Sequence, residues 1–193
     1  MNWQEFWAIS YHFSPLLSGL TAHGFAIKFG WFSSLIQPID QGKTFRGKRI
    51  FGENKTYRGI AMTAIGTALG FAIQSLILHR WEVFQKLELL DYSAVSVIFL
   101  SLIVGAAAML GELPNSFIKR QIDIAPGATS SGILNLFFYI FDQIDYLIGV
   151  WLVFGFFIGV SFQRVIFSAV FLFFSHQIIS LLGYWLGMRK TAR

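Results

Sequence analysis

The sequence contains no cysteine among its 193 residues. This absence excludes disulfide frameworks, zinc–thiolate sites, iron–sulfur clusters and cysteine nucleophiles, so the fold is expected to hold by packing alone. Charged side chains are also scarce, at 13% of the chain against about 25% in an ordinary soluble domain. Because 55% of the residues are hydrophobic and 18% are aromatic, a soluble core of this length would leave too much apolar surface in water. The composition therefore indicates an integral membrane protein.

Long apolar segments predict the membrane spans. The segment Ile60–Leu78 has no charged residue and approaches the roughly 20 residues that a helix needs to cross the hydrocarbon core. Three later segments are comparable, and the apolar N-terminal region adds one whose limits are blurred by Pro15 and His23. We predict an all-α integral membrane protein with about five transmembrane helices in one bundle, and residues 1–193 as a single domain. The expected spans are Trp3–His23, Ile60–Leu78, Tyr92–Leu110, Tyr146–Phe162 and Val165–Gly187.

The distribution of lysine and arginine predicts the orientation. Arg80, Lys86 and Arg164 fall on one side of the predicted membrane, and Lys28 lies near the end of the first span. The other eleven cations fall on the opposite side, which should be cytoplasmic because cytoplasmic loops carry an excess of Lys and Arg. We therefore predict a multi-pass protein of the cell membrane with its N-terminus outside and its C-terminus in the cytoplasm. The eleven cations are Lys43, Arg46, Lys48, Arg49, Lys55, Arg58, Lys119, Arg120, Arg189, Lys190 and Arg193.

The first predicted cytoplasmic loop, Pro38–Gly59, concentrates six cations, four glycines and two threonines. Glycine lets backbone N–H groups approach an anion, and the planar guanidinium of Arg58 matches phosphate oxygens. The loop therefore suits phosphate, and the alternative is an orienting loop that only touches lipid head groups. A nucleotide P-loop is rejected because Gly42-Lys43-Thr44 has Gln37 where the motif requires glycine.

Acidic residues are expected on the same side of the membrane. Glu112 lies at the end of the third predicted span, in a second cytoplasmic loop that runs from Gly111 to Arg120. Asp142 and Asp145 are three residues apart, which places them on one face of a helix. Carboxylates beside a span are costly and usually have a specific partner, and Mg²⁺ prefers one or two carboxylates plus substrate phosphates. The three acids are thus a candidate Mg²⁺ site, unless the two aspartates only favour a helix N-terminus in water.

These motifs, in this order, resemble the CDP-archaeol synthase family, membrane cytidylyltransferases related to bacterial phosphatidate cytidylyltransferases. The resemblance covers most of the chain from Pro38 onward and includes a histidine in the last span, His176. The family usually has Gly-Asp where this chain has Gly111-Glu112. The matching stretches are Pro38-Ile39-Asp40-Gln41-Gly42, Arg49-Ile50-Phe51-Gly52-Glu53-Asn54-Lys55-Thr56-Tyr57-Arg58-Gly59, Ser116-Phe117-Ile118-Lys119-Arg120 and Asp142-Gln143-Ile144-Asp145-Tyr146.

The resemblance implies an enzyme of phospholipid biosynthesis, in which a lipid phosphate monoester attacks the α-phosphorus of CTP to give a CDP-lipid and pyrophosphate, with Mg²⁺ required. CTP would reach the site from the cytoplasm and the lipid tails from the leaflet; a homodimer is compatible with this. The implied catalytic residues are Lys55, Arg58, Asp142 and Asp145, and the implied metal ligands are Asp142, Asp145 and Glu112. The implied nucleotide-binding residues are Asp40, Lys55, Thr56, Arg58 and Gly59, and those for phosphate or lipid are Ser116, Lys119, Arg120 and His176.

The rival function is a small membrane transporter or lipid-binding protein whose basic loop contacts head groups. A transporter would carry polar residues along one face through successive spans. In this sequence the polar residues gather at one leaflet instead, which favours the enzyme. Nucleic-acid binding is not expected, because the many Phe and Trp residues are typical of lipid-facing surfaces and interfacial belts.

Overall fold

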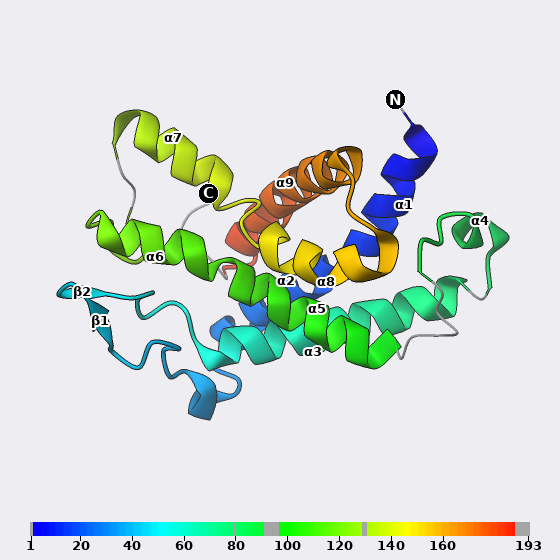
Figure 1. The fold of residues 1–193 in the computed structure, drawn as a ribbon. Coiled ribbons are helices and arrows are strands. Elements are labelled where there is room, and N and C mark those ends of the chain that lie inside the picture. Colours follow the sequence, from blue (N-terminus) through cyan, green and yellow to red (C-terminus); the bar gives the residue numbers. More distant parts are fainter. Residues whose placement is uncertain (1, 79, 91–96, 129–130, 188–193) are drawn as a thin grey trace.

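The computed structural model describes residues 2–78, 80–90, 97–128 and 131–187. These residues are mainly helical, as the sequence predicts, with one small hairpin of strands β1 (Thr44–Phe45) and β2 (Lys48–Arg49) and a 3-10 turn, η1 (Ser33–Leu35) (Figure 1). The helices are α1 (Trp3–Phe13), α2 (Pro15–Lys28), α3 (Tyr57–Leu78), α4 (Glu82–Gln85), α5 (Val97–Gly111), α6 (Leu113–Gln121), α7 (Gly132–Phe141), α8 (Leu147–Ile158) and α9 (Phe162–Trp185).

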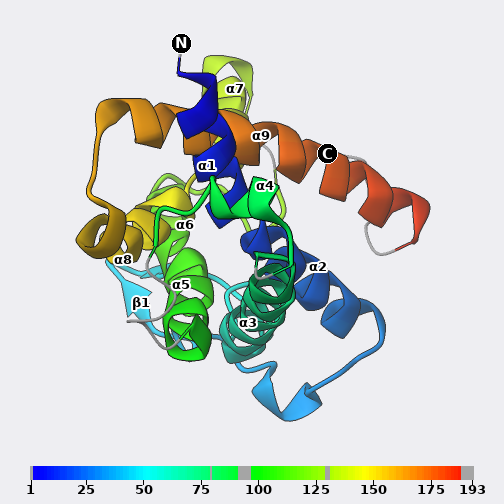
Figure 2. The same ribbon diagram turned by 90° about the vertical axis from the view of Figure 1, so that its right-hand side faces the viewer.

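Small residues allow the central helices to pack closely. Helix α3 lies between α2 and α5, and α8 packs on the other side of α5 (Figures 1 and 2). A Cβ atom on Gly66 of α3 would lie 2.6 Å from the Cβ of Ala22 in α2, and one on Gly149 of α8 would lie 1.7 Å from the carbonyl oxygen of Ala107 in α5. Any larger side chain at these two glycines would push the helices apart, as expected for helix packing in membranes.

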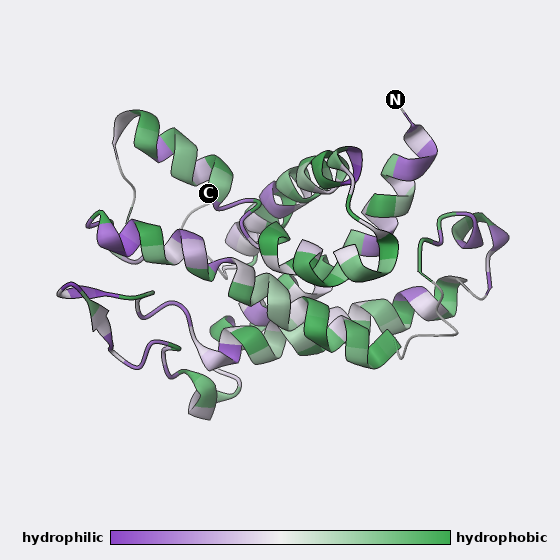
Figure 3. Ribbon diagram, viewed as in Figure 1, coloured by the Kyte–Doolittle hydropathy of each residue, from purple (hydrophilic) through white to green (hydrophobic). Residues whose placement is uncertain are grey.

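Three helical segments are long and apolar enough to cross a membrane: Tyr57–Ile77, Val97–Gln121 and Phe162–Trp185. Their outer surfaces are apolar, and Leu76 and Phe99 are 67% and 69% exposed (Figure 3). Such surfaces require lipid around them. The chain is a multi-pass membrane protein, and the predicted spans Ile60–Leu78 and Val165–Gly187 correspond to α3 and α9.

The other predicted spans differ from the observed helices. The N-terminal segment forms two helices that meet at Pro15, the first residue of α2, where the missing N–H costs no helical hydrogen bond. Helix α2 continues to Lys28, five residues beyond the predicted end. The predicted fourth span is a helix of 12 residues, because Gly159 adopts a φ of +71° and ends it. Residues 92–96 of the third predicted span lie outside the described residues, as do the tail cations Arg189, Lys190 and Arg193.

Two helices occupy segments that the sequence analysis treated as loops. The predicted second cytoplasmic loop is helix α6, which continues the direction of α5. Pro114 does not prevent this, because it stands in the first turn of α6, where proline is tolerated. Helix α7 was missed because its apolar stretch of 10 residues is too short to span a membrane. Asp142 and Asp145 follow α7 in the turn before α8, so the prediction that they share one face of a helix is wrong.

The two ends of the bundle gather different elements. The end of α2, the start of α3, helix α6 and the end of α9 lie together, and we call this the site end. There the ammonium of Lys28 donates to the carbonyl oxygen of Leu186 at 2.6 Å. At the opposite end, Arg164 at the start of α9 donates to Glu5 of α1 at 2.9 Å and also binds the carbonyl oxygen of Ile158.

Candidate functional site

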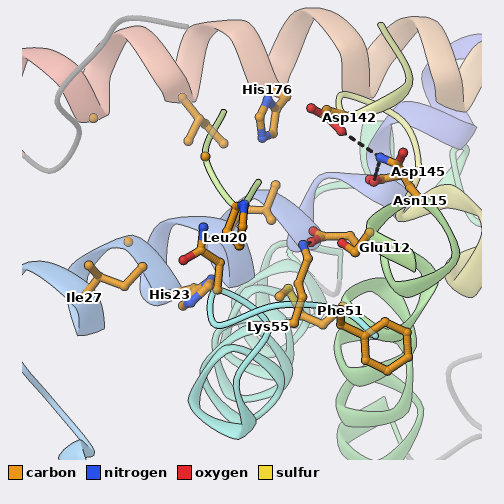
Figure 4. A pocket seen from close by; sticks show the side chains of 18 of the residues that line it. Leu20, His23, Ile27, Phe51, Lys55, Glu112, Asn115, Asp142, Asp145 and His176 are labelled. Carbon is orange, nitrogen blue, oxygen red and sulfur yellow. Dashed lines mark hydrogen bonds and ion pairs between the residues drawn. The ribbon is translucent and has the colours of Figure 1, made fainter. Parts of the chain in front are cut away.

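A cavity of about 450 Å³ opens at the site end, between α2, the loop before α3, α5, α6, the turn before α8, and α9 (Figure 4). The structure brings together eight residues that the sequence analysis singled out and leaves four others outside the lining. Those in the lining are Lys55, Glu112, Ser116, Lys119, Arg120, Asp142, Asp145 and His176. Those outside it are Asp40, Thr56, Arg58 and Gly59.

Asp40 organises the loop that carries Lys55. Its buried carboxylate accepts hydrogen bonds from Arg49 Nη2 at 2.6 Å and from the backbone N–H groups of Gly42, Phe51 and Gly52 at 3.1, 3.0 and 2.9 Å. Burial by itself would raise the pKa of Asp40, but these donors outweigh it and hold the pKa well below its usual range. A carboxylate so fully engaged supports the loop, and its predicted contact with nucleotide stays a prediction.

A second set of contacts fastens this loop to α6. The ammonium of Lys48 donates to the carbonyl oxygen of Gln121 and to Asp123, both at 2.7 Å. The rings of Phe45 and Phe117 lie 5.7 Å apart between hairpin and helix. The loop is therefore held against α6, and this position makes Phe51, Asn54 and Lys55 part of the cavity wall.

The start of α3 lies directly behind the cavity. The hydroxyl of Thr56 accepts from the backbone N–H of Gly59 at 3.2 Å, which caps the first turn of the helix. A Cβ atom on Gly59 would lie 3.1 Å from Met109 and 3.3 Å from His23, two residues of the cavity wall. Thr56 and Gly59 therefore support residues of the cavity wall without lining the cavity themselves. Arg58 turns away, and its Nη1 donates to the carbonyl oxygen of Trp31 at 3.5 Å.

Acids and cations alternate across the cavity. Lys55 forms an ion pair with Glu112, and Figure 4 shows the two side chains meeting in the middle of the cavity. Burial tends to lower the pKa of Lys55, but the carboxylate of Glu112 outweighs it and raises the pKa above the ordinary lysine value. The ammonium of Lys119 contacts both oxygens of Asp142. The predicted meeting of the acidic residues with the lysine-bearing loop is therefore present in the structure.

Asn115 joins the two aspartates. Its Nδ2 donates to Asp142 at 2.7 Å and to Asp145 at 2.6 Å (Figure 4). Among the described residues, no three His, Cys, Asp or Glu side chains are grouped as a preformed metal cage. The donor set nevertheless fits Mg²⁺, because two carboxylates converge and the buried Oδ1 of Asn115 has no hydrogen-bond partner. Mg²⁺ needs only one or two carboxylates where substrate phosphates supply further oxygens.

Arg120 offers free donors to an anion. Its Nε and Nη1 atoms are buried without a hydrogen-bond partner, and the side chain lines the cavity. Guanidinium nitrogens that are buried without partners are costly, so an anionic ligand that reached them would relieve the cost. From the other side His176 Nδ1 binds Gln143 Oε1 and so connects α9 to the turn that carries the aspartates.

Several residues of the cavity were missed by the sequence analysis. Asn115 is the most informative, because Glu112, Asn115 and Lys119 follow the spacing of one helix face. That spacing would have signalled their convergence if Leu113–Gln121 had been interpreted as helix. The remaining missed residues lie on loops or apolar faces whose sequence carries no such signal; they include Phe51, Asn54, Pro126, Gly127 and His23.

Comparisons with known proteins identify the family to which the chain is similar. The sequence profile of the CarS-like CDP-archaeol synthases matches residues 9–192. The CDP-archaeol synthase of Pyrobaculum islandicum is 30% identical over 182 residues, which is 93% of this chain and 96% of the relative. That of Methanocaldococcus jannaschii is 28% identical over 157 residues, covering 80% of this chain and 82% of the relative.

The fold has a counterpart of known structure. An intramembrane enzyme for archaeal membrane lipid biosynthesis superposes with a TM-score of 0.61, covering 87% of this chain and 89% of its own, at 16% sequence identity. At that identity the likeness concerns the fold alone. The profile, in contrast, spans residues 9–192, nearly the whole sequence. The chain therefore belongs to the CDP-archaeol synthase family.

Proposed function

We propose that this chain is a CTP-dependent cytidylyltransferase that makes a CDP-activated lipid for membrane lipid biosynthesis, and that the cavity at the site end is its active site. The observation that carries the proposal is the set of residues that line the cavity. Lys55, Lys119 and Arg120 lie with Asp142 and Asp145 at its polar end, and α2 and α9 contribute apolar side chains to another part of the lining. This combination suits a triphosphate and a lipid phosphate held side by side.

The proposed reaction is a displacement at the α-phosphorus of CTP. An oxygen of the lipid phosphate monoester forms a new bond to that phosphorus, and the bond to the bridging oxygen of the β-phosphate breaks. The electron pair leaves with pyrophosphate, so the products are a CDP-lipid and pyrophosphate. The nucleophile is a phosphate oxygen that is already anionic, so no protein base is needed to remove a proton.

The residues around the cavity supply binding and charge. Asp142 and Asp145 would hold Mg²⁺, with the Oδ1 of Asn115 as a further oxygen. When bound, Mg²⁺ neutralises charge on the phosphates of the transferred and leaving groups. Lys119 and Arg120 are consecutive residues of α6 that both line the cavity, and they would bind phosphate oxygens.

Lys55 is proposed to bind the triphosphate of CTP. Its partner in the structure is Glu112, which the sequence analysis included among the metal ligands. Because the ammonium lies inside the cavity and interacts electrostatically with both aspartates, it is a candidate contact for the triphosphate. We expect Lys55 to bind the β- or γ-phosphate while Glu112 keeps it in place, which leaves Glu112 a positioning residue unless it also reaches the metal.

The charges at the two ends of the bundle support an orientation. The site end carries the loop cations, Lys28, Lys119 and Arg120, whereas Arg80 and Lys86 flank α4 and Arg164 belongs to the first turn of α9, elements of the opposite end (Figure 1). By the positive-inside rule, the site end faces the cytoplasm, which is also where CTP is available. With α1–α2 and α8 as two further crossings, the chain would pass the membrane five times and begin outside.

Substitution of the aspartates tests the proposed activity. Asp142→Asn and Asp145→Asn each remove a negative charge from the proposed metal site at almost constant volume, so release of pyrophosphate from CTP should fall by about 100-fold or more. Glu82→Gln, on the short helix α4 outside the cavity, is the matched control and should keep full activity. Unchanged pyrophosphate release in a folded Asp145→Asn protein would contradict the assignment.

The lipid acceptor needs its own experiment. Purified protein should be incubated with labelled CTP, Mg²⁺ and a panel of phosphate monoesters on ester-linked and ether-linked glycerolipids. The relatives are named CDP-archaeol synthases, so we expect the ether-linked phosphate to give the most CDP-lipid. Equal turnover of both classes would assign the selectivity to the phosphate alone.

A further inference from the structure

Two helices form the apolar half of the cavity. Helix α2 contributes Leu20 and Ile27, and α9 contributes Ile179, Leu182 and Leu186, in each case at intervals of three, four or seven residues that place them on one helix face. Ile27, Leu182 and Leu186 nevertheless remain about half exposed, at 51%, 46% and 52%. The seam between α2 and α9 is therefore not covered by another part of the chain that the structure describes.

The two sides of this seam are held by different partners. Helix α2 is fixed to α3, where a Cβ atom on Gly19 would lie 2.7 Å from the carbonyl oxygen of Thr63. Helix α9 is fixed to α1, and the rings of Phe6 and Phe167 lie 5.4 Å apart. Figure 2 shows α2 and α9 sloping in the same direction, with α2 against α3 and α9 against α1. The two sides of the seam therefore have separate main supports.

A single ammonium bridges the seam at the site end. Lys28, the last residue of α2, donates to the carbonyl oxygen of Leu186 at 2.6 Å. Leu186 caps α9, and the final carbonyls of a helix have no partner within the helix and carry partial negative charge. Such a bond to a neutral oxygen is weaker than one to an anion. Among the described residues, Lys28 belongs to no ion pair with a carboxylate, unlike Lys55 and Lys119.

We propose that the seam between α2 and α9 is the opening through which the lipid phosphate monoester reaches the cavity, and that Lys28 is its first phosphate contact. The ammonium exchanges the carbonyl oxygen of Leu186 for a phosphate oxygen, which frees the end of α9 from α2. The lipid tails then lie against Ile27, Leu182 and Leu186, and the phosphate points toward Lys119 and Arg120. This inference rests on the proposed function of the cavity.

The geometry distinguishes Lys28 from the other cations of the site end. Ile27, the residue before it, lines the cavity, whereas Lys28 itself does not. An ammonium at the rim of an apolar opening suits a ligand with an anionic head and an apolar tail. Free CTP has no apolar tail, so it gains nothing from this seam. We therefore expect Lys28 to act on the lipid substrate and not on the nucleotide.

Kinetics of Lys28 variants test the contact. Lys28→Met should raise the KM for lipid phosphate about tenfold, because one charge-assisted hydrogen bond is lost, and leave kcat and the KM for CTP unchanged. Lys28→Arg should restore most of the affinity, since it keeps the charge. Lys43→Met is the matched control, an exposed cation of the β-hairpin region outside the cavity lining. An unchanged KM for lipid, or an equal rise in the KM for CTP, would overturn the role of Lys28.

Cross-linking tests the seam itself, and a chain without cysteine is suited to it. Lys28→Cys and Leu186→Cys are combined and joined by a short, cleavable linker that reacts with two thiols. The linked protein should lose at least about 90% of its CDP-lipid formation relative to the unlinked double variant, while its CTP binding, measured by calorimetry, stays the same. Cleavage of the linker should restore turnover, and single-cysteine variants treated with the reagent are the control.

The outcomes separate this inference from the function on which it rests. If the unsubstituted protein forms no CDP-lipid from CTP, the proposed function fails. If it does form CDP-lipid, and the linked protein turns over lipid as fast as the unlinked one, only the proposed opening fails. Loss of CTP binding on linking would also overturn the inference, because the seam would then serve the nucleotide.

Discussion

The two ends of the bundle use a partly buried arginine in opposite ways. At the end away from the cavity, Arg164 donates to Glu5 at 2.9 Å and to the carbonyl oxygen of Gly159 at 3.3 Å. At the site end, Nε and Nη1 of Arg120 are buried and have no hydrogen-bond partner. The Oδ1 of Asn115, on the same helix, is also buried and has no hydrogen-bond partner. One arginine is satisfied within the protein, and the other belongs to the cavity wall and has two nitrogens without a partner.

The difference is informative because an unsatisfied buried polar group costs about 1–3 kcal/mol. Satisfied groups, such as the pair of Arg164 and Glu5, hold elements together and stabilise the fold. Unsatisfied groups that face a cavity lower stability, and a ligand that supplies the missing partner recovers the cost on binding. The contrast therefore separates a structural cation from a ligand-binding cation where residue type does not.

The largest expected effect is on the unsatisfied arginine. Arg120→Met should lower kcat/KM for CDP-lipid formation by about 100-fold, because a preorganised donor to phosphate is lost. The melting temperature in detergent should not fall, since no internal hydrogen bond of the removed Nε or Nη1 atoms is broken. Both quantities are measured on the same purified variant. A large loss of stability would show that Arg120 is structural and would remove the contrast with Arg164.

Asp40→Asn should have the next largest effect. Its carboxylate accepts from Arg49 and three backbone N–H groups, so its loss should loosen the loop and raise the KM for CTP by about 10-fold or more. The depressed pKa means that this stabilisation is complete above about pH 4, the unfolded value for Asp, and is lost as the pH falls through the lower folded value. The KM ratio of variant to unsubstituted protein should therefore be constant between about pH 5 and pH 8, and a steep change there would contradict a buried, ionised Asp40.

A smaller effect on the KM for CTP is expected at the contacts between Lys48 of the same loop and α6. Lys48→Met removes the bonds to Gln121 and Asp123, but the ammonium group's partner Asp123 is 77% exposed, and an exposed ion pair contributes little. The KM for CTP should rise about threefold with kcat unchanged. Asp123→Asn, which keeps the bond from Lys48 to the carbonyl of Gln121, should change it less. An effect as large as that of Asp40→Asn would place the main support of the loop on α6.

The smallest effect on turnover is expected at the satisfied arginine. Arg164→Met should leave kcat/KM of the folded protein unchanged, because Arg164 lies at the end opposite the cavity. It should instead lower the melting temperature by about 4–8 °C, which corresponds to the loss of about 2 kcal/mol from charged hydrogen bonds. Thermal unfolding and initial rates measured well below the transition would separate the two effects. A selective loss of activity at full stability would mean that the two ends of the bundle are coupled.

Much of the architecture followed from local sequence. The uncharged run Ile60–Leu78 predicted α3, because a helix is the only structure that satisfies its own backbone in lipid. The segment Leu113–Gln121 was harder, since its polar residues are typical of a loop while the preceding span determines that the helix continues. Helix α7 was missed for the opposite reason: an apolar stretch of 10 residues is consistent with several structures until its neighbours are known.

In the candidate site, too, the sequence predicted some features and failed to predict others. Charge and motif order predicted that Lys55, Asp142 and Asp145 would meet, and the cavity contains all three. The same motif placed Arg58 and Asp40 in the site, and the structure puts both outside the lining. A motif records which residues occur together along the chain but not which of them face a ligand, so their individual roles stay predictions.

The sequence by itself determined the solvent of this protein, the positions of its longest helices and the end of the bundle where charge collects, because each depends on composition within about 20 consecutive residues. Only the tertiary structure decided that Asn115 joins two aspartates, that Arg120 remains unsatisfied while Arg164 does not, and that α2 and α9 leave a seam bridged by Lys28. These features depend on contacts between residues far apart in the chain, and such contacts are set by how the helices pack.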